Sequence, residues 1–171
     1  MTIPIRQETP ADHAGVYDLV KEAFASAEHA DGKEQDLVAT LRTGGSFLPK
    51  LSLVAELEGE LAGHILFTKA KVGADPVLVL APLSVKPKFQ RMGVGTALIH
   101  EGHNIAASLG YSYSLVLGSE TYYPRMGYLP AEQLGVTVPE GIPSANFMAS
   151  QLRENAKPLA GTITYPKEFG L

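Results

Sequence analysis

The 171-residue chain contains no cysteine, and its 14 lysine and arginine residues are outnumbered by 18 aspartate and glutamate residues, for a net charge of −4. Without cysteine it can form no disulfide, no thiolate metal site and no thiol nucleophile, so any thioester chemistry must come from a cofactor. Nucleic-acid binding needs clustered lysine and arginine, and the sequence has no such cluster. Nucleic acid is therefore not expected as the main partner.

Long apolar runs are also missing. The longest, residues 77–83, is far too short to span a bilayer, and residues 1–10 lack the apolar core of a signal peptide. We therefore expect a cytoplasmic protein without a membrane partner. The length and the 45% hydrophobic composition are typical of one globular domain, expected to span residues 1–171 with a core at 3–130 and a strand-rich extension at 131–171.

The first quarter of the chain predicts one strand and two helices. Residues 3–9 begin with alternating apolar and polar side chains, which indicates a short strand. Thr9 followed by Pro10 favours a helix start, since threonine caps helix N-termini and proline suits the first turn. The helix then has one apolar face, made by Val16, Leu19, Val20, Ala23 and Phe24. A second, shorter helix is predicted at residues 34–42.

A change to alternating apolar residues predicts strands from residue 51 onward. Residues 51–57 and 61–72 flank a Glu-Gly-Glu turn and indicate an antiparallel hairpin. Residues 77–85 form a nearly continuous apolar strand of the kind found in the middle of a sheet. Pro82 interrupts that strand, and because proline cannot donate to a ladder, we expect a bulge or a splay there.

The second half alternates helices and strands. Residues 93–109 predict a helix that Gly110 ends, residues 113–117 a strand, and residues 119–126 a short helix. Further strands are expected at 136–138, 146–152 and 162–165. Together these elements predict a mixed α/β or α+β sheet.

A glycine turn joins the strand at 77–85 to the helix at 93–109. Gly93 and Gly95 allow the backbone to approach a ligand closely, and the first amides of a helix have no helical partner, so a phosphate can bind there. Arg91, Lys86 and Lys88 add positive charge. A tight turn without a ligand is the simpler alternative. A Rossmann site is disfavoured because Leu98 replaces its third glycine, and no Gly-Lys-Ser/Thr of a P-loop follows.

Two signatures in this order resemble the GNAT superfamily of acetyl-CoA-dependent N-acetyltransferases: residues 90–95 (Gln-Arg-Met-Gly-Val-Gly) and residues 123–128 (Tyr-Pro-Arg-Met-Gly-Tyr). The resemblance covers about residues 3–130 and extends to one bacterial branch through residues 80–85, 116–118 and 122–125. It implies a mostly antiparallel sheet flanked by helices, in which strands 77–85 and 113–117 splay apart around the pantetheine arm of acetyl-CoA.

The resemblance also implies a set of binding residues. Leu83 and Val85 would pair with pantetheine through their backbone groups, and the amides of residues 90–96 would hold the pyrophosphate. The cofactor-binding residues expected on this basis are Leu83, Ser84, Val85, Gln90, Arg91, Met92, Gly93, Val94, Gly95, Thr96 and Tyr123.

The family mechanism is direct attack of an amine on the thioester. By resemblance, Tyr123 would protonate the leaving sulfur, and a free amide on the bulged strand, at Leu83, would stabilise the oxyanion. An isolated tyrosine is more often a packing residue, and Tyr122 is interpreted in that way. No general base stands on strand 77–85, and the acids in suitable regions are Glu22, Glu28, Glu34 and Glu120.

The histidines show no metal-ligand spacing, so no metal is predicted. His100 and His103 are expected on the polar side of their helix, His13 and His29 in helix or loop segments, and His64 inside a strand.

Two other functions remain open at this point: a non-catalytic acyl-CoA-binding or regulatory domain, and a nucleotide-binding fold with a generic glycine turn. The acceptor could be a small-molecule or peptide amine, recognised by the first two helices, their loop and the tail, with residues 27–32 and 44–50 at the border of its cleft. The strand-rich tail could also pair with a second chain and so form a homodimer.

Overall fold

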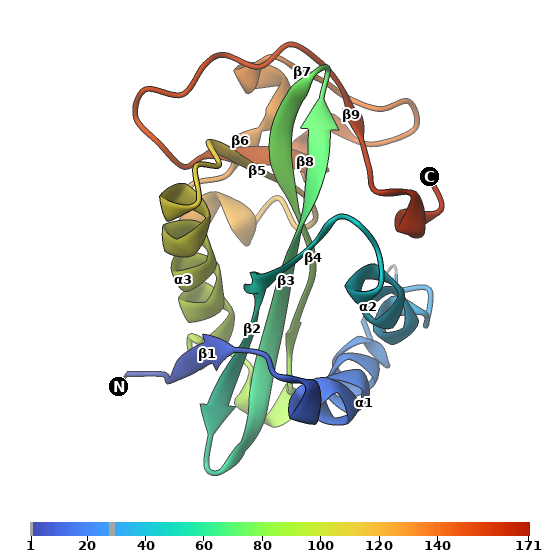
Figure 1. Ribbon diagram of the computed structural model, residues 1–171, viewed down its shortest axis with the longest axis vertical. Coiled ribbons are helices and arrows are strands. Elements are labelled where there is room, and N and C mark those ends of the chain that lie inside the picture. The colour runs from blue at the N-terminus through green and yellow to red at the C-terminus, as the bar shows by residue number, and fades with distance from the viewer. Residues whose placement is uncertain (1, 28–29) are drawn as a thin grey trace.

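The computed structural model describes residues 2–27 and 30–171. Its main feature is a nine-stranded mixed sheet in which seven strands follow the order β1-β2-β3-β4-β5-β8-β6, while β9 pairs with β3 and β7. Figure 1 shows α3 on one side of this sheet and α1 and α2 on the other. Along the described part of the chain, no helix is long and apolar enough to cross a membrane.

Apart from β6, which the sequence did not predict, the helices and strands follow one another in the order that the sequence predicts. Their bounds are β1 Ile5–Gln7, α1 His13–Phe24, α2 Glu34–Arg42, β2 Phe47–Leu57, β3 Glu60–Val72, β4 Asp75–Val85, α3 Val94–Ser108, β5 Tyr113–Leu117, β6 Leu129–Pro130, β7 Val136–Thr137, β8 Phe147–Gln151 and β9 Gly161–Thr164. The pairs β1·β2, β2·β3, β3·β4 and β5·β8 are antiparallel, while β4 and β5 are parallel. The predicted mixed, mostly antiparallel sheet flanked by helices is confirmed.

The start of α1 follows from the residues before it. Thr9 donates its amide to the Asp12 carboxylate at 2.8 Å, and Pro10 opens a short 3-10 turn that leads into the helix. Arg6 on β1 bonds both oxygens of Asp12, which ties the first strand to the first helix. The predicted capping role of Thr9 is therefore confirmed, although its partner is Asp12 in the first turn.

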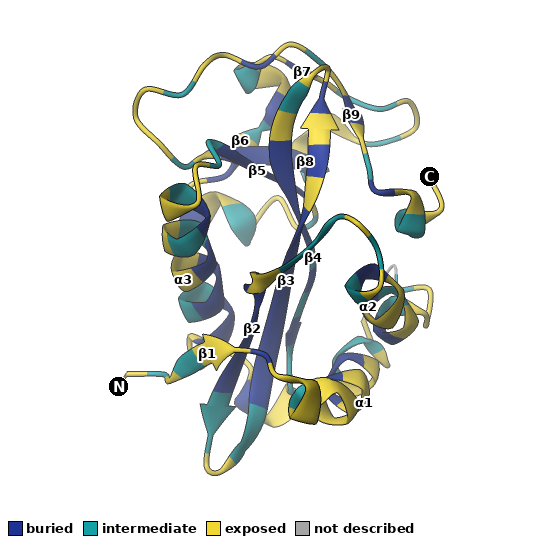
Figure 2. Cartoon of the chain, in the orientation of Figure 1, coloured by how far each residue is buried: buried dark blue, intermediate teal, exposed yellow. Residues whose placement is uncertain are grey.

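Two apolar layers hold the helices to the sheet. On one face, Val94, Leu98 and Ile99 of α3 pack with Leu53, Phe67 and other buried residues of the central strands. On the other face, α1 and α2 contribute Val16, Val20, Val38 and Leu41, which pack against Val54 and Leu66. Figure 2 shows the middle of β2 and β3 as continuously buried, as expected for strands covered on both faces.

Two element predictions differ from the structure. β2 begins at Phe47, four residues before the predicted start, and a register shift separates the Phe47 pair from the Ser52 pair. The helix predicted at residues 119–126 is only a 3-10 turn, Tyr123–Met126. Pro124 lacks an amide hydrogen, and Gly127 at φ 92° ends the turn after one cycle.

The tail completes the sheet instead of leaving a free strand. β8 lies between β5 and β6, and β9 lies between β3 and β7. β8 and β9 thus pair on both sides inside the chain, while β7, of two residues, pairs only with β9 and is the one tail strand with an open edge in the described chain. A homodimer stays a prediction.

Candidate active site

The glycine turn ends in an array of amides at the start of α3. Gly93 has φ 88° and Arg91 has φ 63°, so the chain turns through two left-handed residues just before the helix. The first helical hydrogen bond runs from the Ala97 amide to the Gly93 carbonyl at 3.0 Å. Within the described residues, the amides of positions 91–96 donate to no protein acceptor. Such an array is suited to bind an anion.

The charges around this turn are partly neutralised. Lys86 and Lys88 each place Nζ 2.7 Å from a carboxylate oxygen of Glu60 in the preceding hairpin. Arg91, which lies in the turn, is exposed and makes no ion pair with a carboxylate among the described residues. Of the three basic residues that the sequence places here, Arg91 is therefore the one available to a bound anion.

The strands β4 and β5 part next to this turn. They pair only at Leu78 with Ser114 and at Val79 with Leu115, yet β4 continues to Val85. Against β3, the register of β4 shifts by one residue between the Phe67–Leu80 and Ile65–Leu83 pairs. The extra residue lies at Ala81-Pro82, where the sequence predicts a bulge, so this prediction is confirmed.

Backbone groups of Leu83 and Val85 face the resulting gap. The Lys86 amide donates to the Ala62 carbonyl at 2.8 Å, which makes Ala62 and Lys86 a hydrogen-bonded pair in the antiparallel ladder. Hydrogen-bonded and non-hydrogen-bonded pairs alternate, so Leu83 and Val85 direct their N–H and C=O groups away from β3. The Val85 carbonyl accepts a bond from the Gln90 side chain at 3.3 Å, on that open side.

Three tyrosines line the region after β5. Tyr123 stacks edge-on with both Tyr122 and Tyr128, at centroid distances of 5.1 and 5.6 Å. Gly118 permits this arrangement, because a Cβ there would contact the Tyr123 ring. Burial raises the pKa of Tyr123 well above its usual value, so the phenol stays protonated and can only donate a proton. Tyr122 packs against the turn, since a Cβ at Gly95 would overlap its hydroxyl.

A buried polar cluster, which the sequence did not predict, lies on the α1/α2 face of the sheet. Glu8 accepts two hydrogen bonds from Arg42, at 3.0 and 2.6 Å, and one from the Ser52 hydroxyl at 2.8 Å. The same hydroxyl lies 3.0 Å from His64 Nε2. Burial alone would raise the pKa of Glu8, but the bond from Arg42 and the neighbouring His64 and Ser52 lower it below its ordinary value. The only sequence signal was His64 itself, a histidine inside an apolar strand.

The acids considered as general bases do not gather at the gap. Glu22 is exposed on α1, Glu34 accepts the Asp31 amide at the start of α2, and Glu120 accepts a bond from Asn146. Glu28 and His29 lie outside the described residues. The role of each of these acids stays a prediction.

The structure confirms some of the histidine predictions and contradicts one. His64 lies inside β3 as predicted, and His100 is exposed. The prediction for His103 is wrong: it faces the sheet, 3.0 Å from the Tyr128 hydroxyl and beside Phe67, because α3 packs closely there through Gly102. Among the described residues, no three potential ligand side chains gather where they could hold a metal ion.

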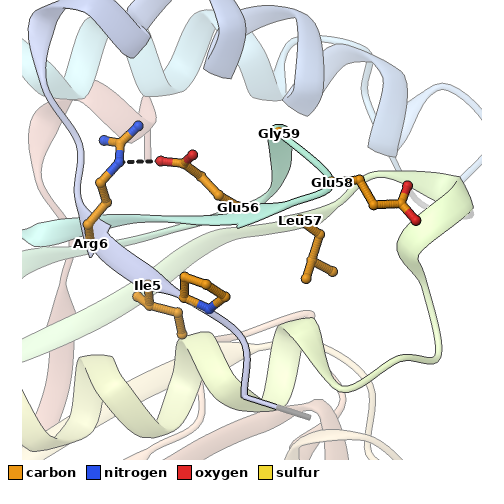
Figure 3. Close-up of a pocket in the computed structure, with 7 residues that line it drawn as sticks. Ile5, Arg6, Glu56, Leu57, Glu58 and Gly59 are labelled. Atoms are coloured by element: carbon orange, nitrogen blue, oxygen red, sulfur yellow. Dashed lines mark hydrogen bonds and ion pairs between the residues drawn. The ribbon is translucent and has the colours of Figure 1, made fainter.

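A surface hollow of about 350 Å³ lies near the β2–β3 hairpin (Figure 3). It is lined by residues 4–6 and 56–59 and contains the Arg6–Glu56 ion pair. None of its lining residues belongs to the glycine turn or to the parted strands. The candidate active site is therefore the gap between β4 and β5 together with the start of α3.

This combination of a parted β4–β5 pair and an amide-lined turn agrees with a family match. Residues 14–128 match the acetyltransferase (GNAT) family. This chain belongs to that family. The predicted resemblance and the predicted enzyme class, an N-acetyltransferase, are confirmed at this level.

Similar proteins and structures extend the match. The uncharacterized N-acetyltransferase YjhQ of Escherichia coli K12 is 42% identical over 139 residues, which is 77% of each chain. The crystal structure of E. coli YhbS in complex with CoA has a TM-score of 0.87 and 28% identity, and the alignment covers 99% of this chain and 92% of that one. A GNAT acetyltransferase from Brucella melitensis in complex with acetyl-CoA has a TM-score of 0.80 and 28% identity, with 98% of both chains covered.

Proposed function

We propose that this GNAT enzyme, acting as one domain, binds acetyl-CoA between β4 and β5 and transfers its acetyl group to a primary amine of a small molecule or a peptide. The observation that carries this proposal is the coincidence of two free hydrogen-bonding surfaces. The amides of residues 91–96 lack protein acceptors within the described chain, and β4 continues past its last pair with β5. A diphosphate fits the first surface and an extended amide chain fits the second.

The binding residues follow from these two surfaces. Leu83 and Val85 offer backbone groups to the pantetheine arm, with Ser84 between them, and the turn from Arg91 to Thr96 offers its amides to the diphosphate. The expectation for the Gln90 amide is wrong, because it donates to the Pro87 carbonyl at 3.3 Å. Arg91 adds an exposed positive charge to that turn. The complexes of E. coli YhbS with CoA and of the Brucella melitensis protein with acetyl-CoA support the same co-substrate here.

Acetyl-CoA supplies the thioester on which the amine acts. We expect the Leu83 amide to stabilise negative charge on the acetyl oxygen, a role supported by its direction away from β3 directly after the bulge. In this proposal Tyr123 donates its proton to the departing sulfur. A phenol has an ordinary pKa of about 10 against about 8.5 for a thiol, and burial widens this difference, so Tyr123 assists the reaction without dominating it.

A screen of amines with acetyl-CoA, read as release of free thiol, tests the proposal. The panel holds an amino acid, a polyamine, an aminoglycoside and a short peptide, and isothermal titration with acetyl-CoA runs beside it. Turnover of at least one amine supports the proposed function and defines the acceptor class. Acetyl-CoA binding without thiol release from any amine would instead favour a non-catalytic acyl-CoA-binding domain.

The acceptor is expected to enter from the side of α1, α2 and residues 44–50. α1 packs against β3 and β4, so this side borders the strand that would carry the thioester. A cytoplasmic location is proposed together with the acetyl-CoA co-substrate.

A further inference from the structure

Four buried side chains form a row across the α1/α2 face of the sheet, from β4 to the segment after β1. They are Ser84, His64, Ser52 and Glu8, and we call them the buried polar line. Ser84, His64 and Ser52 are at most 2% exposed, and Glu8 is 8% exposed. Polar groups at this depth need partners, so the positions of their hydrogens can be derived from the bonds that they make.

The hydrogen assignment along the line is determined by Glu8. Its carboxylate is held ionised by Arg42 and can only accept, so the Ser52 hydroxyl must donate its single hydrogen to Glu8. Ser52 Oγ can then only accept from His64, which places the ring hydrogen on Nε2. His64 is thereby fixed in one tautomer with a lone pair on Nδ1.

This lone pair lies on the side of Ser84, a residue of the strand that borders the proposed acetyl-transfer position. His64 Nδ1 and Ser84 Oγ are buried, and neither has a hydrogen-bond partner among the described residues. His64 and Ser84 stand directly opposite each other on β3 and β4, so their Cβ atoms are about 5 Å apart on one face of the sheet. Ser84 lies between Leu83 and Val85, the two residues whose backbone groups face the gap.

The opposite end of the line reaches the surface. His13 on α1 places Nε2 3.9 Å from Glu8 Oε1, and its side chain is 45% exposed. The charged and titratable groups that face His64 are Glu8 from the first loop and Arg42 from α2. The line is hydrogen-bonded from His64 through Ser52 to Glu8, while Ser84 at one end and His13 at the other lie close to it without a hydrogen bond in the free protein.

Building on the acetyl transfer proposed above, we propose that the buried polar line is a proton relay, which takes the proton lost by the attacking amine at Ser84 and delivers it through Glu8 to His13. The only carboxylate on β4, Asp75, stands at the opposite end of the strand from Ser84, and β4 carries no histidine.

The relay begins when the Ser84 hydroxyl, which is buried and unbonded in the free protein, turns toward His64 Nδ1 and meets the acceptor amine. As the C–N bond forms, the nitrogen gives one proton to Ser84 Oγ, and Ser84 gives its own hydrogen to His64 Nδ1. His64 then passes its Nε2 hydrogen to Ser52, and Ser52 passes its hydrogen to Glu8, which releases it toward His13. As the C–S bond breaks, the sulfur takes the electron pair and receives its proton from Tyr123. Solvent then returns a proton to the Tyr123 phenolate, and His64 regains its Nε2 hydrogen through Ser52 and loses the Nδ1 hydrogen before the next turnover.

His64 changes tautomer in this sequence without becoming charged. That agrees with its surroundings, because burial lowers the pKa of His64 from 6.5 to about 4 and the ring therefore stays neutral over the working range. The relay is accordingly competent from about pH 5 upward, where Glu8 is ionised and the Nδ1 lone pair is free.

The test uses the pH profile of kcat with the amine that turns over best in the panel. His64→Gln keeps an amide donor toward Ser52 but cannot relay a proton. We expect kcat to fall about 100-fold at pH 6.5 and the loss to shrink several-fold by pH 9.5, where hydroxide takes the proton directly. The Kd for acetyl-CoA should stay within about threefold of the wild-type value.

Two further variants separate relay from structure. Ser84→Ala should show the same pH-dependent loss, and it keeps the test open if His64→Gln does not fold. Thr68→Val removes another buried hydroxyl without a partner among the described residues, on the same strand and face as His64 but outside the line. Its pH profile should match that of the wild type. A loss in His64→Gln and Ser84→Ala that is constant with pH would overturn the relay.

A measurement that needs no turnover tests the relay independently. ¹⁵N spectra of the histidine rings should show His64 as the neutral Nε2–H tautomer at pH 7, and Ser52→Ala should release a mixture of tautomers. A hydrogen on Nδ1 in the wild type overturns the relay while leaving acetyl transfer intact. A wild type that acetylates no amine overturns the proposed function itself, and the relay with it.

Discussion

Replacing Gly93 with alanine perturbs the glycine turn at a single torsion. Gly93 has φ 88°, and no heavy atom lies within 4 Å of the position that a new Cβ would take. The substitution therefore causes no steric overlap, and its only direct effect is the strain of an L-residue in the left-handed region. That strain is about 1–2 kcal/mol.

This strain can appear in two measurable ways. If the turn keeps its shape in the free protein, unfolding becomes easier, and the melting temperature falls by about 2–4 °C per kcal/mol for a chain of this size. If the turn relaxes in the free protein, CoA must restore it on binding. The Kd for CoA then rises about 5- to 30-fold, which corresponds to the same energy.

Gly110→Ala is the matched control, at the opposite end of α3. Gly110 has φ 98° and also has no heavy atom within 4 Å of a new Cβ, so it carries the same backbone strain. Isothermal titration with CoA and urea unfolding should be measured for both variants. We expect each variant to lose no more stability than its backbone strain, and only Gly93→Ala to lose affinity for CoA. Unchanged CoA affinity in Gly93→Ala, with its full strain appearing in stability, would show that the variant keeps the turn in the free protein. An equal loss of CoA affinity in Gly93→Ala and Gly110→Ala would contradict a specific role of the glycine turn in CoA binding.

Three other substitutions test separate parts of the reasoning. Tyr123→Phe should lower kcat roughly tenfold and leave the Kd for acetyl-CoA unchanged, because a general acid acts only in the reaction. The assay measures kcat at saturating substrate, and an unchanged kcat would remove Tyr123 from the mechanism. Arg91→Asn removes the charge, and asparagine tolerates the left-handed backbone that Arg91 adopts. CoA affinity should therefore fall about fivefold at low salt and much less at 0.5 M salt. An equal loss of affinity at the two salt concentrations would exclude a charge effect. Burial lowers the pKa of His64 from 6.5 to about 4, so the unfolded chain binds the extra proton, and His64 alone should lower the stability by up to about 3 kcal/mol as pH drops from 6.5 to 4. His103 has a pKa lowered to the same value and adds its own loss, so urea unfolding of His64→Gln should show a smaller dependence on pH than the wild type. An equal dependence in both proteins would contradict the neutral buried His64 ring.

Local rules were enough to predict the surroundings of the glycine turn. Pro82 inside an apolar strand predicted the bulge because proline removes a ladder donor, and the structure has its register shift at that point. The glycines predicted a turn before a helix, and Gly93 indeed has a positive φ. Both features depend on a few adjacent residues, whose torsions do not need distant partners.

The buried polar line could not be found in this way. Its closest pairs join residues 12 to 44 positions apart, Ser52 with His64 and Glu8 with Ser52. No spacing rule connects them, because their contact depends on the register of three strands and on the packing of α2. The early start of β2 was missed for a related reason. Pro49 and Lys50 break the alternation of apolar residues, and Phe47 belongs to the sheet only because it pairs with the distant Thr68 on β3.

The bulge at Ala81-Pro82 has a consequence for how β4 can serve two substrates. Leu78 and Leu80, which precede the bulge in the chain, face α3, and so do Leu83 and Val85, which follow it. The extra residue thus exchanges the two faces of the strand. In a regular strand, Ser84 would point into the apolar layer under α3, and Leu83 would cover His64. With the bulge, the residues whose backbone groups face the gap bury their side chains under α3, and the residue between them directs its hydroxyl to the buried polar line. The same shift therefore parts β4 from β5 and places a polar side chain on the acceptor side.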